Sequence, residues 1–243
     1  MDRAVRVMLL WMAVSGAALA QDEKTCEADM PPGKNFAQAR FRFWYPKEAK
    51  ELRAAIVLMP GSNDDGRSLA QDPFWQELAT KHRLGLVGVC FKDRPHDNMN
   101  IEAYARAGEG SGAALLAAMT HFAKAAGHSE LTRALLLLWG HSAGGEFNYE
   151  FACWKPERVM AFVVNKGGYY FTHLAPEATR RVPGIFFIGG RDEEFRIFSL
   201  RGVFAVNQRA GAVWKLVVAP EEGHEIGATR GKAAAFFEGV LSQ

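Results

Sequence analysis

Short apolar runs alternate with stretches of helical periodicity along most of the chain. Several runs are continuously apolar, which is typical of strands that helices cover on both faces of a sheet. We predict strands at Phe41–Tyr45, Ala55–Met59, Leu84–Phe91, Ala134–Trp139, Val159–Asn165, Gly184–Ile188 and Trp214–Ala219. We predict helices at Phe74–His82, Gly112–Ala126, Ala143–Cys153, Ser199–Gln208 and Thr229–Leu241. The alternation predicts an α/β fold with a doubly wound, mostly parallel sheet flanked by helices.

The first twenty residues have a different pattern. Arg3 and Arg6 precede an apolar run over residues 7–19, and the small-x-small sequence ending at Ala20 follows. This pattern predicts a secretory signal peptide that is cleaved after Ala20. A membrane anchor is the alternative, but an apolar run of about 13 residues is too short to span a bilayer. We therefore expect an exported protein, periplasmic or secreted, in which residues 21–243 form one domain.

The composition excludes some classes of binding partner but identifies none. The 243 residues are 49% hydrophobic, which excludes a disordered chain, and no second apolar run is long enough for a membrane span. The net charge of +2 comes from 29 basic and 27 acidic residues that form no basic stripe, so we expect no nucleic-acid partner. Three cysteines, Cys26, Cys90 and Cys153, allow one disulfide, or Cys90 and Cys153 are small buried residues. Neither the cysteine pairing nor the oligomeric state follows from the sequence.

A nucleophile motif stands between a predicted strand and a predicted helix. Residues 140–144 read Gly-His-Ser-Ala-Gly, a G-x-S-x-G pattern. At such a strand-to-helix turn the serine hydroxyl is exposed, and the flanking glycines let the backbone approach closely. The Ala143 amide, at the start of the following helix, becomes one oxyanion donor. The alternative is a glycine-rich turn in which Ser142 only caps the helix.

The proposed serine needs a base, and the base needs an orienting acid. Two histidines follow Ser142 in the sequence, and His224 lies just after the last predicted strand, where chain order places the base. His173 lies in a connecting segment and is interpreted as a substrate-side or surface residue. Asp192 is the one aspartate after Ser142 and is the expected acid, with the adjacent Glu193 and Glu194 as alternatives.

Together these three segments carry a family resemblance. Residues 140–144, the Gly-Gly-Arg-Asp loop at 189–192 and the Gly-His turn at 223–224 resemble the α/β-hydrolase superfamily. The resemblance runs from about Ala55 to the C-terminus. It is greatest to small secreted esterases of the dienelactone hydrolase, feruloyl and acetylxylan esterase and polyhydroxybutyrate depolymerase types. It implies acyl transfer through a covalent acyl-serine, with no metal and no cofactor.

The resemblance also implies a second oxyanion donor. In these enzymes an early strand ends in His-Gly-x and the backbone amide of x binds the oxyanion. Here residues 60–62 read Pro-Gly-Ser, so Ser62 takes this role beside Ala143. Pro60 replaces the histidine, but the Ser62 donor is a backbone amide and does not depend on that side chain.

Substrate identity is less constrained. Residues 166–182 are too short for a separate lid domain, which predicts an open site. Tyr169, Tyr170 and His141 are candidate substrate contacts, although the tyrosines also fit core packing. An open, exported site favours short-chain, aromatic or carbohydrate-linked esters, as small molecules or on a polymer. The alternatives are a serine peptidase or thioesterase on the same fold, or a non-catalytic binding protein.

Overall fold

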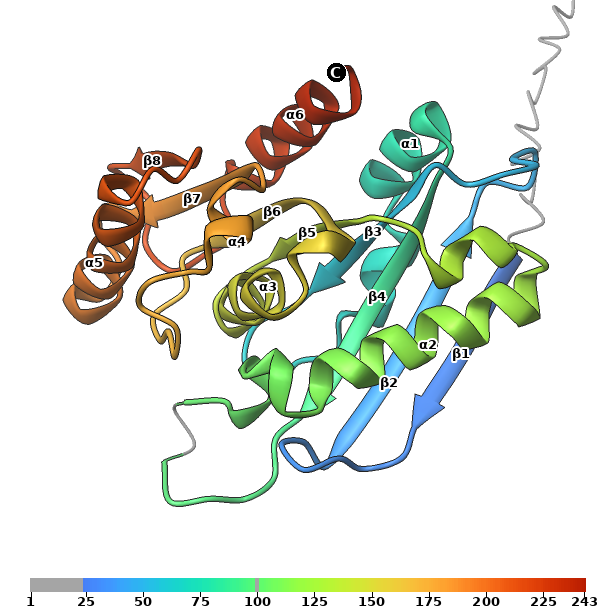
Figure 1. Ribbon diagram of the computed structural model, residues 1–243, viewed down its shortest axis with the longest axis horizontal. Helices are drawn as coiled ribbons and strands as arrows, with labels where there is room; N and C mark the ends of the chain where they lie inside the picture. Colours follow the sequence, from blue (N-terminus) through green and yellow to red (C-terminus); the bar gives the residue numbers. More distant parts are fainter. Residues whose placement is uncertain (1–23, 99–100) are drawn as a thin grey trace, which may run out of the picture.

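The computed structural model describes residues 24–98 and 101–243, and within them eight strands form one sheet (Figure 1). The strands are β1 (Lys24–Met30), β2 (Gln38–Tyr45), β3 (Ala54–Met59), β4 (Leu84–Lys92), β5 (Leu136–Gly140), β6 (Val159–Asn165), β7 (Gly184–Gly189) and β8 (Lys215–Ala219). Their order across the sheet is β1-β2-β4-β3-β5-β6-β7-β8. The β1–β2 and β2–β4 pairs are antiparallel, and the remaining pairs are parallel.

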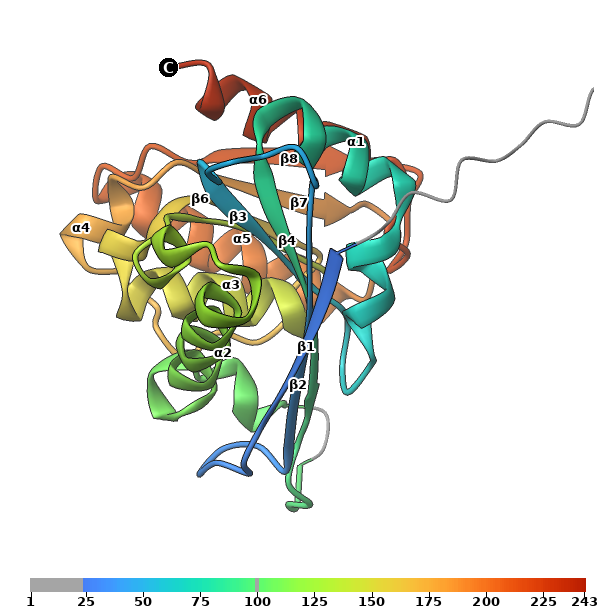
Figure 2. The ribbon, with the colours of Figure 1, turned by 90° about the vertical axis from the view of Figure 1, so that its right-hand side faces the viewer.

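Helices cover both faces of this sheet, as Figure 2 shows with the sheet seen nearly edge-on. The α-helices in the described residues are α1 (Pro73–His82), α2 (Ser111–Ala126), α3 (Ala143–Trp154), α4 (Glu177–Arg180), α5 (Glu194–Arg209) and α6 (Thr229–Leu241). Short 3-10 helices lie at Gly66–Gln71, Ala103–Ala105, Ala107–Glu109, Ser129–Thr132 and Pro156–Arg158. One apolar core joins α2, α3 and α5 to the sheet, and a second joins α1 and α6 to its other face. The predicted doubly wound, mostly parallel sheet is confirmed.

The predicted elements agree with this architecture, with three differences. The strand β1 was not predicted, because its alternate residues are polar and only its inner face, with Ala28 buried, meets the core. The helix α5 begins at Glu194, earlier than the predicted Ser199, since its charged first turn resembles an acidic loop. The short α4 also went unpredicted. Gly127, predicted to end α2, does so with φ of 75°.

The structure describes the cysteines but not the predicted signal peptide. Cys26, Cys90 and Cys153 are all free thiols; Cys90 is buried, whereas Cys26 and Cys153 are half-buried. Burial raises the pKa of each thiol. The predicted signal peptide, residues 1–20, lies outside the described residues. No helix in the described part of the chain has the length and apolar character needed to cross a membrane.

The parallel strands end at one edge of the sheet, and the candidate residues follow them there. Ser62 follows β3, Ser142 follows β5, Asp192 follows β7 and His224 follows β8. In open α/β sheets, ligands bind outside the carboxyl ends of the strands. The fold therefore brings loops that are far apart in sequence to one place.

Candidate active site

Ser142 lies in a strained turn between β5 and α3. Its φ of 53° and ψ of −124° form a conformation that L-residues rarely adopt and that costs about 1–3 kcal/mol. Glycines make the turn possible: a Cβ on Gly140 would lie 2.2 Å from the Gly144 carbonyl oxygen. A Cβ on Gly144 would lie 2.5 Å from the Met59 carbonyl oxygen. The close packing of this turn against β3 holds the serine in place.

The side chains of Ser142, His224 and Asp192 form one hydrogen-bonded chain. Nε2 of His224 is 3.0 Å from Oγ of Ser142, and Nδ1 of His224 donates to Oδ2 of Asp192 over 2.9 Å. The Asp192 side chain is 2% exposed, whereas that of His224 is 37% exposed. The Glu193 amide donates to the other Asp192 oxygen over 2.8 Å, which fixes the carboxylate. The structure thus brings together the three residues predicted as nucleophile, base and acid.

The alternative residues lie elsewhere. Glu193 points to Arg196, with which it forms an ion pair of 3.0 Å, and Glu194 is exposed at the start of α5. His173 is exposed, and its carbonyl accepts a hydrogen bond from Asn207. Neither the two glutamates nor His173 is hydrogen-bonded to the Ser142–His224 pair.

A buried lysine holds the loop that carries His224. Lys166 directly follows β6, is 1% exposed and donates from Nζ to Oε2 of Glu222 over 2.8 Å. The same ammonium donates to the Glu225 carbonyl, so it contacts the loop on both sides of His224. The Lys166 hydrogen bond lowers the pKa of Glu222. Sequence reasoning missed Lys166, although a lysine at the carboxyl end of an apolar strand was a usable signal.

The two predicted oxyanion donors lie on either side of Ser142. Ser62 is exposed in the loop after β3, and a Cβ on the adjacent Gly61 would lie 3.8 Å from Cβ of Ser142. Ala143 is the first residue of α3. Within residues 24–98 and 101–243, neither the Ser62 nor the Ala143 backbone amide donates a hydrogen bond, so both remain available to a ligand. The loop itself is fixed because the Asn63 amide donates to the Tyr104 hydroxyl over 3.0 Å.

Two hollows meet at Ser142. The larger hollow, of about 640 Å³, is lined by residues 60–66 and by His141 and His224. The smaller hollow, of about 280 Å³, is lined by Tyr169 and Phe195 and by four charged side chains, Glu102, Glu146, Glu193 and Arg196. Ser62, Ser142 and Arg196 line both. Ser142 therefore has two distinct hollows beside it.

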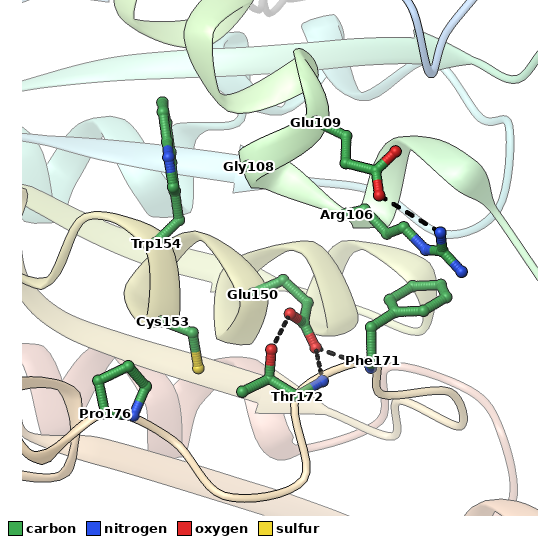
Figure 3. A pocket seen from close by; sticks show the side chains of 9 residues that line it. All are labelled: Arg106, Gly108, Glu109, Glu150, Cys153, Trp154, Phe171, Thr172 and Pro176. Carbon is green, nitrogen blue, oxygen red and sulfur yellow. Dashed lines mark hydrogen bonds and ion pairs between the residues drawn. The ribbon is translucent and has the colours of Figure 1, made fainter.

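A third hollow, of about 460 Å³, lies along α3 (Figure 3). Its walls include Cys153 and Trp154 on one side and Phe171 and Thr172 on the other. The Glu150 carboxylate accepts hydrogen bonds from the backbone amides of Phe171 and Thr172. None of Ser142, Asp192 and His224 lines it. It is separate from the candidate active site.

The predicted substrate contacts divide between these spaces. His141 lines the larger hollow and Tyr169 the smaller one. Tyr170 lines neither of these two hollows; it packs against Tyr149 with ring centroids 5.4 Å apart, and its hydroxyl is buried. Burial and the neighbouring His224 lower the pKa of His141 to about 4, so this imidazole is neutral at neutral pH. His141 therefore lines the larger hollow as a polar side chain without a charge.

Glu146 is a buried acid that sequence reasoning missed. It lies one turn into α3 from Ser142 and is 1% exposed. Its Oε1 accepts from the amides of Gly168 and Tyr169 over 2.7 and 3.0 Å, while Oε2 has no partner among the described residues. Burial raises the pKa of Glu146 to about 7, and the charge of Glu102 adds to the effect. A charged residue in the first turn after the serine was the available signal.

Replacing Glu146 with glutamine should change how stability depends on pH. Because the folded pKa is about 7 and the ordinary value is 4.5, the native state favours the protonated acid. The associated stability is full below pH 4.5 and is lost as pH rises through about 7. Relative to Glu146→Gln, the wild type should lose about 3 kcal/mol of unfolding free energy across this window.

Urea unfolding at pH 4.5 and pH 8 measures the difference between wild type and variant. Glu157→Gln, an exposed carboxylate with 62% of its side chain accessible, is the control and should follow the wild type. Equal pH dependence in Glu146→Gln and wild type would show that Glu146 ionises as freely in the native state as in the unfolded chain.

In the described part of the chain no cluster of three or more His, Cys, Asp or Glu side chains has an arrangement suited to a metal ion. The candidate chemistry rests on the hydrogen-bonded Ser142, His224 and Asp192.

Comparison with known proteins places the fold. No family model matches the chain, and no curated protein matches it. Among solved structures, it is similar to LpqC, a poly(3-hydroxybutyrate) depolymerase from Bordetella parapertussis, with 20% identity over 89% of each chain and a TM-score of 0.65. It is also similar to esterase PE8, with 19% identity over 80% of this chain and 96% of that one and a TM-score of 0.60.

A third similar structure is the S-formylglutathione hydrolase FrmB from Staphylococcus aureus, with 10% identity over 90% of this chain and 97% of that one and a TM-score of 0.62. At these identities the likeness establishes the fold, which is that of the α/β-hydrolases. The predicted resemblance is confirmed at this level, and the chemistry of this chain has to be argued from its own site.

Proposed function

We propose that this chain is a serine hydrolase that cleaves carboxylic esters through an acyl-serine intermediate. The observation that carries the proposal is the continuous path from Ser142 Oγ through His224 to Asp192, with contacts of 3.0 and 2.9 Å. A serine in such a path is activated because the base takes its proton as the oxygen attacks. The strained turn at Ser142 supports the same reading, since strain of this kind collects at functional sites.

In the proposed reaction, His224 Nε2 accepts the Ser142 proton while Oγ attacks the ester carbonyl. The Asp192 carboxylate holds Nδ1–H and stabilises the imidazolium that forms. The amides of Ser62 and Ala143 donate to the negative oxygen of the tetrahedral intermediate. His224 then protonates the leaving alcohol. A water molecule, deprotonated by His224, then attacks the acyl-serine. The bond between the acyl carbon and Ser142 Oγ breaks, His224 returns the proton to Oγ, and the acid leaves.

We further propose an exported enzyme with a cleaved signal at residues 1–20 and one catalytic domain at residues 21–243. The segment between β6 and β7 carries only the four-residue α4, which supports an open site for short-chain, aromatic or carbohydrate-linked esters. The similarity to esterase PE8 and to a poly(3-hydroxybutyrate) depolymerase supports the ester class. The similarity to an S-formylglutathione hydrolase keeps thioesters as the second candidate.

Hydrolysis of 4-nitrophenyl esters of increasing acyl length tests this function, alongside feruloyl and acetylated-sugar esters and matched thioesters and anilides. The proposal expects ester cleavage that falls steeply beyond short acyl chains, because the smaller hollow holds only about 280 Å³. A preference for long chains would contradict the open site. Cleavage of anilides but not of esters would indicate a peptidase instead of an esterase.

A further inference from the structure

The two hollows beside Ser142 have different positions relative to the base. His224 lines the larger hollow and not the smaller one. The base has to protonate the oxygen of the departing alcohol, so that oxygen lies on the His224 side. The alcohol therefore extends into the larger hollow, and the acyl group extends into the smaller one.

The smaller hollow contains two nearly buried carboxylates. Glu102 is 4% exposed, and its carboxylate has no hydrogen-bond or ion-pair partner among the described residues. Glu146 is 1% exposed and leaves Oε2 without a partner. The buried, unpaired Oε2 of Glu146 is costly in free energy when charged, because it has lost water without gaining a hydrogen-bond donor. Both groups belong to the same hollow as Ser142, so a ligand there would meet both.

The acids of this hollow outnumber its cations. Among the described residues that line the smaller hollow, Arg196 is the one cation. Its Nε lies 3.0 Å from Glu193 and 3.9 Å from Asp192, and its guanidinium lies 4.8 Å from the centroid of the Phe195 ring. The charge of Arg196 also acts on Glu146, but Arg196 is one cation against three glutamates. The charge of Glu102 contributes to the raised pKa of Glu146, which is the mark of two acids that repel each other.

An aromatic pair completes the walls. The rings of Tyr169 and Phe195 lie 5.3 Å apart at 35°, and both side chains line the smaller hollow. The faces of aromatic rings attract cations, most strongly those that carry little hydration, such as quaternary ammonium groups. Carboxylates and aromatic rings together form a site suited to an alkylammonium group.

We propose that the smaller hollow is an acyl subsite that binds a positively charged amine, so that the preferred substrate is an ester whose acyl group carries an ammonium. The inference rests on the proposed function, because it assigns the hollow to the acyl side of an ester bound at Ser142. The ammonium sits between Glu102 and Glu146 against Tyr169. It adds positive charge to a hollow that three glutamates and one arginine line.

A pair of phenyl esters that differ in one charge tests the proposal. The first has 4-(trimethylammonio)butanoate as its acyl group, and the second has the neutral isostere 5,5-dimethylhexanoate. For wild type we expect kcat/KM to be at least about tenfold higher for the cationic ester, since opposite charges at contact attract strongly in a partly buried site. In Glu102→Gln this ratio should fall severalfold. Glu157→Gln, which removes an exposed carboxylate at the opposite edge of the sheet, should keep the wild-type ratio.

The outcomes separate this inference from the proposed function. Phenyl acetate serves as a third substrate. If wild type cleaves phenyl acetate but treats the pair alike or prefers the neutral ester, the acyl subsite is wrong and the esterase proposal stands. If none of the three esters is cleaved, both fail. The wild-type ratio decides the question even if Glu102→Gln does not fold, and an unchanged ratio in a folded Glu102→Gln would remove Glu102 from the site.

Discussion

Ser142→Ala is expected to lower kcat for an aryl acetate by about 10⁶-fold, the cost of losing the nucleophile of a serine triad. The reason is structural: Ser142 Oγ is the oxygen that His224 Nε2 reaches at 3.0 Å, and alanine leaves the base without a proton to take. Binding of the ester should change far less than turnover, because the hollows and the backbone amides stay in place. Steady-state hydrolysis of 4-nitrophenyl acetate measures both kcat and KM.

Ser129→Ala is the matched control. Ser129 is exposed in the 3-10 helix that precedes β5, at the opposite edge of the sheet from the site. It should retain wild-type turnover. A Ser142→Ala enzyme of near wild-type rate would mean that the measured hydrolysis proceeds at another group.

Asp192→Asn should reduce kcat by about 10⁴-fold while leaving the fold intact. The Asp192 carboxylate accepts a hydrogen bond from Nδ1 of His224 over 2.9 Å, which leaves Nε2 free to take the serine proton. An asparagine amide can donate to Nδ1 instead, and the imidazole then carries its proton on Nε2, where it cannot act as a base. The same steady-state assay with 4-nitrophenyl acetate measures the loss.

Glu194→Gln provides the comparison for Asp192→Asn, since Glu194 is an exposed carboxylate two residues away. Its turnover should stay within about threefold of wild type, an effect below 1 kcal/mol. Retained activity in Asp192→Asn would transfer the orienting role to Glu193 or Glu194.

The fold was predictable because its strands are nearly continuous apolar runs. β3, β5 and β7 are buried along their whole length, and such runs stand out against amphipathic helices. β1 is different: it is an edge strand that pairs only with β2, and its few inward apolar residues give a weak pattern. The charged start of α5 was missed because local polarity does not distinguish an exposed helical turn from a loop.

Part of the candidate site was predictable for a different reason. Ser142, Asp192 and His224 each follow a strand, and parallel strands bring their carboxyl ends to one edge of the sheet. Glu102 and Glu146 belong to different segments, and no local pattern reports that a 3-10 turn and a helix bring their carboxylates to one hollow. Tyr169 and Tyr170 show the finer limit, because they are neighbours in sequence and only Tyr169 lines the site.

The central claim is that Ser142 is an activated nucleophile, and labelling with a fluorophosphonate tests it most directly. This reagent phosphonylates serines whose hydroxyl is activated by a base. Peptide mass spectrometry should find one adduct per chain, on Ser142, and His224→Ala should abolish it while Ser129→Ala leaves it unchanged. Correctly folded protein that stays unlabelled, or an adduct on another serine, would contradict the account.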